Sequence, residues 1–273
     1  MKTSLLVLGA CVVLVGVARA ATDPADELRP ILRDFLQEAN YSWVTPSSRG
    51  MPEEPGTMLG EDAEGQHERN GYTRIAFKSG PHFQDGWSPG RPRLGFTDES
   101  TFWSSHWVYE MRDGWARLSD LKLPTSLPSR SAPARPGSVK LGGGRIGITK
   151  TLRWAGAWRP DLEIAIIVEN LAGVEKVRKD VFEVELTPNG AGMLALYPYS
   201  PLPLMPVHTE NATGSVTIQV RQGAIAAYDL NLEAVVVMLQ SRIKRVISRR
   251  RILSDIGTTI IEIPAEVEKA LGH

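Results

Sequence analysis

The sequence predicts an α+β protein built on one strongly curved antiparallel β-sheet, a half-barrel, with an N-terminal helix, short internal helices and a C-terminal helix. Three observations predict this class. An amphipathic helical pattern follows Asp23, long alternating strands with short connections fill the last third of the chain, and Pro264 opens a closing helix. Long neighbouring strands joined by short turns are typical of an antiparallel meander. The order of helices and strands indicates an α+β fold, and we expect the helices on one face of the sheet.

The first predicted element is a helix that begins at Asp23 and Pro24. Aspartate is a favoured N-cap residue, and proline fits the first helical position. Apolar residues then recur at helical spacing, with charged residues on the other side of the helix. These apolar residues are Leu28, Ile31, Leu32, Phe35 and Leu36. Residues 40–45 alternate in character and predict a strand.

The next part of the chain predicts short strands separated by long loops. Three stretches are rich in glycine and proline and are expected to be loops, at residues 46–66, 79–101 and 123–144. Residues 71–78 alternate and predict a strand. Asp113 and Gly114 lie between two extended runs, at residues 106–111 and 115–118, which is a strong signal for a β-hairpin.

After these loops the pattern changes to helix, strands and short helix. Residues 160–171 carry an apolar stripe at helical spacing and predict a helix. Residues 174–186 predict a strand pair or one long strand. Thr187 and Pro188 are expected to cap a short helix that ends at Leu196.

The last third contains the longest predicted strands. They are expected at residues 215–221, 224–237, 242–256 and 258–263. Gln222 and Gly223 form the turn between the first two. Pro264 then starts a helix over residues 265–271.

Residues 1–20 have the composition of a cleavable signal peptide. Lys2 gives a positive start, residues 5–17 are almost entirely apolar, and residues 18–20 match the small-x-small cleavage rule. An apolar run of about 13 residues is short for a membrane span, which needs about 20. We therefore expect an exported protein, periplasmic or extracellular, with residues 21–273 as a single domain. An uncleaved membrane anchor is a minor alternative.

Cys11 is the one cysteine of the chain, and its surroundings allow a second interpretation. Residues 8–11 resemble a lipobox, in which the cysteine becomes the lipidated N-terminus of a lipoprotein. Residues 12–17, however, are apolar where a lipoprotein normally turns polar. Cleavage after residue 20 removes Cys11, so the mature protein has no disulfide and is held together by packing alone.

The composition excludes several classes of function. Acidic and basic residues number 31 each, and the signal peptide carries away two cations, so no bulk positive charge attracts nucleic acid. The histidines are scattered without metal-ligand spacing, and we expect no metal and no cofactor. Ser88 lies in a G-x-S-x-G pattern, but the following Pro89 lacks the backbone N–H that a nucleophile elbow requires. We therefore expect no catalytic residues and a protein that is not an enzyme.

One local excess of positive charge lies in the predicted strand 242–256. Its members are Arg242, Lys244, Arg245, Arg249, Arg250 and Arg251. Because alternate residues of a strand face opposite ways, Arg249 and Arg251 share a face with Leu253, and Arg250 lies on the other. The cluster is either a solvated outer face that prevents edge pairing, or a contact of Arg249, Arg250 and Arg251 with anionic lipid or a partner protein.

Several short segments stand out beyond their secondary-structure signals. They are residues 39–43, 70–72, 113–115, 181–187, 214–218 and, most specific, 255–266. In these segments the chain resembles secreted bacterial proteins that share the fold of the periplasmic lipoprotein carriers, the LolA/LppX-like half-barrels. The resemblance implies a curved antiparallel sheet closed by helices around a hydrophobic concavity, which in the carriers holds acyl chains. The long predicted loops depart from that group.

Three functions stay open at this point. The first is an exported, non-enzymatic binding protein that holds a lipid or another apolar ligand in the curved sheet. The candidates for lining that ligand are Phe182, Ile218, Tyr228, Leu230 and Leu232. The second is a structural or interaction protein of the envelope, with a protein partner or peripheral membrane contact and no small ligand. The third is a hydrolase, for which the sequence shows no convergent acid or nucleophile cluster.

Overall fold

The computed structural model describes residues 23–38, 40–46, 57–59, 62–69, 71–79, 93–97, 108–111, 114–117, 159–196, 207–238 and 241–272. The predicted signal peptide with Cys11, the G-x-S-x-G segment around Ser88 and the predicted loop 123–144 lie outside these residues. None of the helices in the described ranges combines the length and apolar character that crossing a membrane requires.

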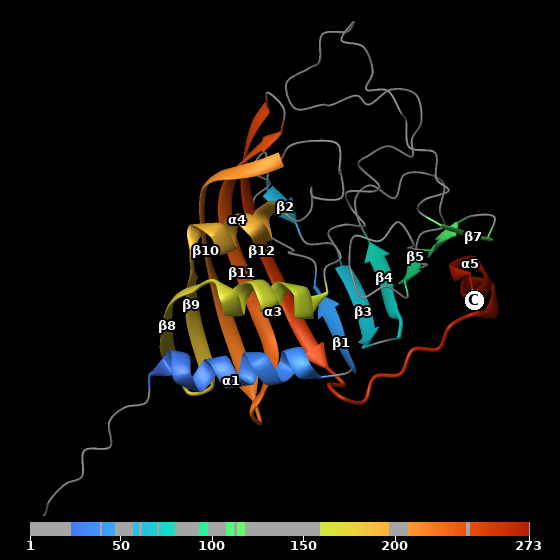
Figure 1. The fold of residues 1–273 in the computed structure, drawn as a ribbon, viewed down its shortest axis with the longest axis horizontal. Helices are drawn as coiled ribbons and strands as arrows, with labels where there is room; N and C mark the ends of the chain where they lie inside the picture. The colour runs from blue at the N-terminus through green and yellow to red at the C-terminus, as the bar shows by residue number, and fades with distance from the viewer. Residues whose placement is uncertain are drawn as a thin grey trace, which may run out of the picture.

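The described strands form one 12-stranded sheet that curves around a set of helices (Figure 1). The strands are β1 (Asn40–Thr45), β2 (Thr57–Leu59), β3 (Asp62–Glu68), β4 (Thr73–Ser79), β5 (Arg93–Thr97), β6 (Val108–Met111), β7 (Gly114–Arg117), β8 (Leu171–Arg178), β9 (Val181–Leu186), β10 (Val207–Arg221), β11 (Ala224–Met238) and β12 (Ser241–Ser254). Their order is β7-β6-β5-β4-β3-β1-β12-β11-β10-β9-β8, with β2 beside β12. Neighbours in this order are antiparallel, and β2 is parallel to β12. The predicted fold class is confirmed.

The helices begin and end close to the predicted residues. They are α1 (Pro24–Gln37), α3 (Pro160–Glu169), α4 (Pro188–Leu196) and α5 (Ala265–Leu271). The Asp23 side chain accepts a hydrogen bond from the Ala25 N–H at 2.9 Å, which confirms the predicted cap of α1. The Thr187 hydroxyl accepts one from the Gly190 N–H at 3.1 Å and caps α4 in the same way.

Three helices cover one face of the sheet, here called the concave face (Figure 1). α1 contacts β8, β11 and α3, while α4 packs on β10, β11 and α3. Their buried residues join one apolar core with the inward residues of β9–β11. Members from the helices are Leu28, Leu32, Phe35, Ile164, Ile167, Ala191, Leu194 and Ala195. The recurrence of apolar residues along α1 therefore predicted its packing face correctly.

The C-terminal helix lies on the opposite face, which corrects the expectation that all helices share one face. Phe96 and Val108 pack with Val267 and Leu271 of α5 in a second apolar cluster. Phe96 alternates along β5 with Thr97, which pairs with Thr73 and so belongs to the concave face. α5 thus covers the outer face near β6 and β7, far along the sheet from α1.

Two of the predicted loops contain strands. β2 and most of β3 lie within residues 46–66, and β5 lies within residues 79–101. β3 is polar and contains Gly65, so its composition hides it, yet it pairs with β1 on one side and β4 on the other. Tertiary pairing overrides weak strand propensity here.

The predicted strand 258–263 is also wrong. Asp255 and Gly257 adopt positive φ angles and turn the chain at the end of β12. The segment then bonds to side chains at the ends of β1 and β3. Asn40 Nδ2 donates to the Thr259 carbonyl at 2.7 Å, and the Ile261 N–H donates to Glu68 Oε1 at 2.6 Å. These two backbone groups are satisfied without a neighbouring strand.

Candidate functional site

The five predicted lining residues lie together on the concave face. Phe182 of β9 pairs with Ile218 of β10, which pairs with Tyr228 of β11. Leu230 and Leu232 follow Tyr228 on the same face of β11. Each is at most 4% exposed, and all belong to the core cluster that contains the helix residues. The side chains are therefore adjacent, as the sequence suggested, and in this conformation the helices enclose them.

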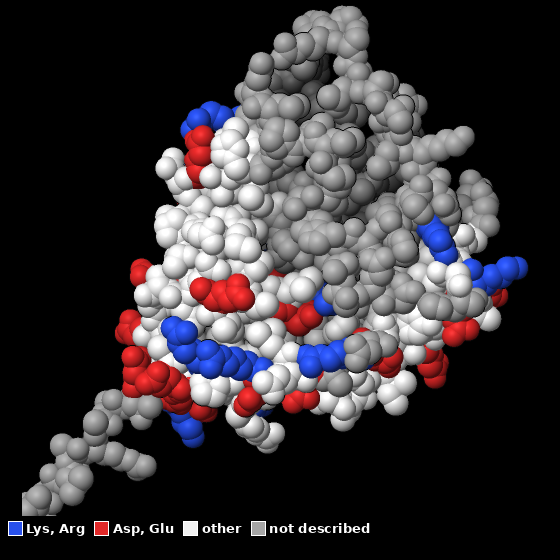
Figure 2. Space-filling view, viewed as in Figure 1, with Lys and Arg blue, Asp and Glu red and all other residues white. Residues whose placement is uncertain are grey.

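The surface over the covering helices is uneven in charge. Charged side chains gather along α1 and over both ends of α3, while the surface over α4 is free of them (Figure 2). The sequence of α4 contains no charged residue, and its Met193 is exposed. The helices that cover the concave face therefore present an uncharged edge beside α3.

Arg249 and Arg251 are not on the surface. Their side chains are 9% and 1% exposed, and both reach across the concave face to Glu163 of α3, which is fully buried. They are therefore not placed to meet an anionic membrane or a protein partner, and the interpretation of the trio as a surface contact is wrong for these two. Arg250 faces outward, where it lies 3.4 Å from Asp229.

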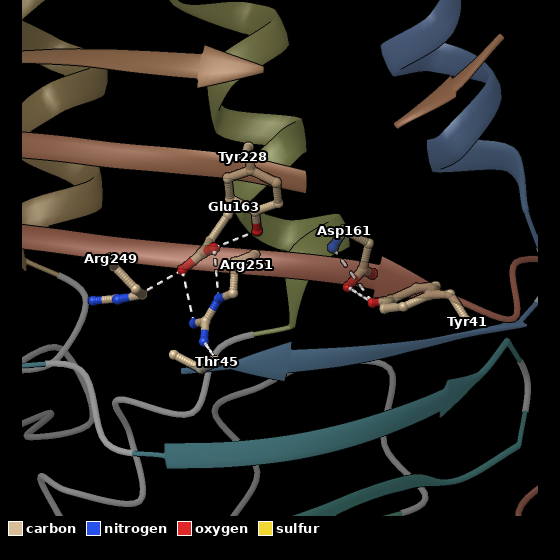
Figure 3. A network of polar contacts seen from close by, with 7 residues as sticks. All are labelled: Tyr41, Thr45, Asp161, Glu163, Tyr228, Arg249 and Arg251. Carbon is tan, nitrogen blue, oxygen red and sulfur yellow. Dashed lines mark hydrogen bonds and ion pairs between the residues drawn. The ribbon is translucent and has the colours of Figure 1, made fainter. Parts of the chain in front are cut away.

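The buried carboxylate of Glu163 is surrounded by donors from two strands, β11 and β12 (Figure 3). Oε1 accepts from Arg249 Nη1 at 2.6 Å and from Arg251 Nη2 at 3.1 Å. Oε2 accepts from Arg251 Nε at 3.2 Å and from the Tyr228 hydroxyl at 2.5 Å. Arg251 also donates to the Thr45 hydroxyl on β1. Arg251 is therefore a bidentate partner, the geometry in which a guanidinium binds a carboxylate best.

The electrostatics of this group follow from burial and from the two guanidiniums. Burial by itself raises the pKa of Glu163, but the charges of Arg251 and Arg249, with hydrogen bonds from Arg251 and Tyr228, outweigh it and lower the pKa below its usual range. Burial, and then the charge of Glu163, raise the pKa of Tyr228. Glu163 is thus ionised at neutral pH. Its contribution to stability is lost only as pH falls below the usual carboxyl range and through its lowered pKa.

A second polar group lies on the same face beyond β12. The Tyr41 hydroxyl donates to Asp161 Oδ1 at 2.5 Å, and Arg159 forms a bidentate pair with that carboxylate at 3.1 and 2.9 Å. The ring of His67 on β3 lies 5.3 Å from the ring of Tyr41, and its Nδ1 is 2.9 Å from the Thr73 hydroxyl. The concave face is therefore largely apolar along β9–β11, and from β12 onward it carries polar groups among apolar residues such as Trp43 and Leu253.

His67 gives the protein a predicted dependence on pH. Burial first, and then the charge of Arg159, lower the pKa of His67 to about 4, from about 6.5 in an unfolded chain. Between these values the unfolded chain binds a proton that the folded protein does not. The contribution of His67 to the free energy of unfolding is therefore fully present above pH 6.5, and about 3 kcal/mol of it is lost as pH decreases to 4.

Urea unfolding at a series of pH values checks this dependence. His67→Gln, which keeps a hydrogen-bonding side chain, is expected to flatten the slope between pH 6.5 and 4. His208→Gln is the matched control because His208 is exposed on β10. An unchanged slope in His67→Gln contradicts the assignment.

The sequence did not identify Glu163, Tyr41, Asp161, His67 or Thr45 as site residues. Two signals were present. Glu163 interrupts the apolar residues of the predicted helix 160–171. In addition, Arg249 and Arg251 share a face of the predicted strand with Leu253, an apolar residue. Neither signal reveals the pairing, since Arg249 is 86 residues from Glu163 in sequence. Among the described residues, no group of histidine, cysteine, aspartate and glutamate side chains is arranged to hold a metal ion.

Comparison with known proteins gives similarity in structure only. No family model matches the sequence, and no curated protein matches it. LprF from Mycobacterium bovis aligns with 89% of this chain and 96% of its own, at 6% identity and a TM-score of 0.43. The Mycobacterium tuberculosis lipoprotein LppX aligns with 87% of this chain and 97% of its own, at 9% identity and a TM-score of 0.37. Similarity of this degree carries no ligand or activity to this chain. LppX is one of the two carriers that give their names to the half-barrel fold implied by the sequence resemblance.

Proposed function

We propose that the protein is an exported, non-enzymatic binding protein that holds the acyl part of a lipid, or another apolar ligand, between the curved sheet and its covering helices. One observation carries the proposal. The five apolar and aromatic residues Phe182, Ile218, Tyr228, Leu230 and Leu232 lie in register on one concave face and are covered by helices.

Ligand entry requires α3 or α4 to move away from the sheet. Both helices are held there by side-chain packing, with Ile164 and Ile167 of α3 and Leu194 of α4 fully or almost fully buried. An acyl chain that replaces such side chains buries a similar apolar area, at about 0.8 kcal/mol per CH₂ group. The exchange is therefore nearly balanced in hydrophobic free energy.

The contacts of Glu163 and Asp161 support a binding function over hydrolysis. A glycosidase-type mechanism uses one carboxyl group as an acid and another as a nucleophile or base. Glu163 is neutralised by Arg249 and Arg251, and Asp161 is engaged by Arg159 and Tyr41. These contacts hold both carboxylates in ion pairs with arginine, so neither is free to act on a substrate.

Native mass spectrometry of protein purified from an envelope fraction tests this proposal. We expect a mass above that of the protein by one lipid, and recovery of the adduct when stripped protein is incubated with dodecanoate. The same sample under denaturing conditions is the control, because a non-covalent ligand dissociates and a lipid attached at Cys11 does not. A bare mass that dodecanoate does not change contradicts the proposal.

A further inference from the structure

The inward face of α3 has the chemical form of an anionic amphiphile. The buried Glu163 presents a carboxylate, and Ile164 and Ile167 beside it present aliphatic groups, all without exposed surface. The carboxylate lies on the polar part of the concave face, while the isoleucines join the apolar core. An acidic head and an aliphatic body therefore occupy the two halves of this face together.

The floor under the carboxylate is built for an anion. Arg249, Arg251 and Tyr228 donate to Glu163 from β12 and β11, and both guanidiniums are at least nine-tenths buried. Two guanidiniums thus converge on one carboxylate. The planar donor pattern of arginine fits the oxygens of a phosphate, a sulfate or a carboxylate equally well.

Trp43 provides an independent observation on the same face. It precedes Thr45 by two residues on β1 and pairs with Leu253, the neighbour of Arg251 on that face of β12. Its indole Nε1 is buried and has no hydrogen-bond partner among the described residues. Since buried donors are nearly always bonded, this indole N–H is a donor that the described side chains leave unsatisfied.

We propose that Arg249 and Arg251 form the head-group site of an anionic lipid, whose phosphate, sulfate or carboxylate replaces the Glu163 carboxylate when α3 moves away from the sheet. The acyl chain then takes the place of Ile164 and Ile167 above Leu230 and Leu232. This inference rests on the proposed function and adds the class of lipid to it.

Charge pairing explains why the site selects anions. When α3 leaves, the two buried guanidiniums lose Glu163, and a buried charge without a counter-charge is strongly unfavourable. An anionic head group restores the pairing, and a neutral head group does not. An anionic amphiphile is therefore expected to bind at least about tenfold more tightly than a neutral one with the same chain, the effect of one unpaired charged group.

Titration calorimetry with three probes tests the inference. Dodecyl phosphate and dodecyl maltoside have the same chain and differ in charge, and glycerol 3-phosphate is an anion without a chain. We expect dodecyl phosphate to bind at least tenfold more tightly than dodecyl maltoside and glycerol 3-phosphate not to bind. Equal affinity for the two dodecyl compounds overturns the head-group site and leaves the proposed function standing. Tight binding of glycerol 3-phosphate alone identifies a free-anion site and overturns the lipid assignment. Binding of none of them overturns both proposals.

Two variants locate the effect. Arg251→Gln is expected to abolish the preference for dodecyl phosphate, and Arg250→Gln is the matched control because it makes the same change on the outward face of β12. Should Arg251→Gln not fold, Glu163→Gln keeps both arginines and removes the competing carboxylate. Dodecyl phosphate is then expected to raise the Tm of Glu163→Gln more than that of the unaltered protein. Equal shifts, or a preference retained in Arg251→Gln, contradict the inference.

Discussion

Glu163→Gln is expected to lower the free energy of unfolding by about 3–5 kcal/mol, because it leaves Arg249 and Arg251 buried without their carboxylate. The glutamine keeps the size of the side chain, so the loss reports charge rather than volume. Equilibrium urea unfolding measures it. Glu233→Gln is the matched control: Glu233 pairs with Lys244 at 2.8 Å, both side chains are exposed, and such pairs are worth at most about 1 kcal/mol.

A combined variant distinguishes the contribution of this ion group to stability from its role in ligand binding. Replacing Glu163, Arg249 and Arg251 together by methionine removes all three charges, and apolar replacement of a buried ion group is often neutral or stabilising. We expect this variant to unfold near the urea concentration of the unaltered protein and to bind both dodecyl compounds equally. A loss as large as that of Glu163→Gln contradicts the view that removal of the Glu163 charge from beside the arginines causes the instability.

Gly65→Ala has the second large expected effect. A Cβ atom at Gly65 on β3 lies 2.0 Å from Cζ2 of Trp43, whose rigid ring is 1% exposed and packs directly over the glycine. Because neither ring nor strand yields easily, we expect a loss of about 2–3 kcal/mol in urea unfolding, the upper part of the range for overpacking.

Gly173→Ala is the control for this change. Gly173 also lies in a strand, β8, and the atom nearest to its Cβ is Glu185 Oε2 at an ordinary 3.6 Å. Its replacement is expected to alter stability by less than about 0.5 kcal/mol. Combining Gly65→Ala with Trp43→Leu is expected to destabilise less than the sum of the two single changes, because the smaller side chain frees the space. If the losses in stability of the two single changes simply add, the Trp43 ring is not what prevents a Cβ atom at position 65.

The parts of the fold that were predictable are those with a local signal. The cap at Asp23 and Pro24, the periodic apolar residues of α1 and the turn at Gln222 and Gly223 are fixed by neighbouring residues, and all are present. β3 was not predictable in the same way. It contains a glycine at position 65 because Trp43 lies over that residue, a requirement set by another strand.

The candidate site also has a part that was predictable from local sequence and a part that was not. Alternation predicted that Tyr228, Leu230 and Leu232 share a face, and pairing with β10 and β9 adds Ile218 and Phe182 to it. Alternation also separated Arg250 from its two neighbours. Arg249 and Arg251 are buried because they pair with Glu163 of α3. No local sequence pattern connects β12 to α3.

The position of the acyl chain is the most direct test of the central claim. Dodecanoate with a diazirine in its chain can be bound, irradiated and located by peptide mass spectrometry. We predict labels on concave-face residues of β9–β11, such as Phe182, Leu230 and Leu232. Labels confined to exposed apolar residues of the outer face, such as Val44 and Ile252, would contradict a ligand held between the helices and the sheet.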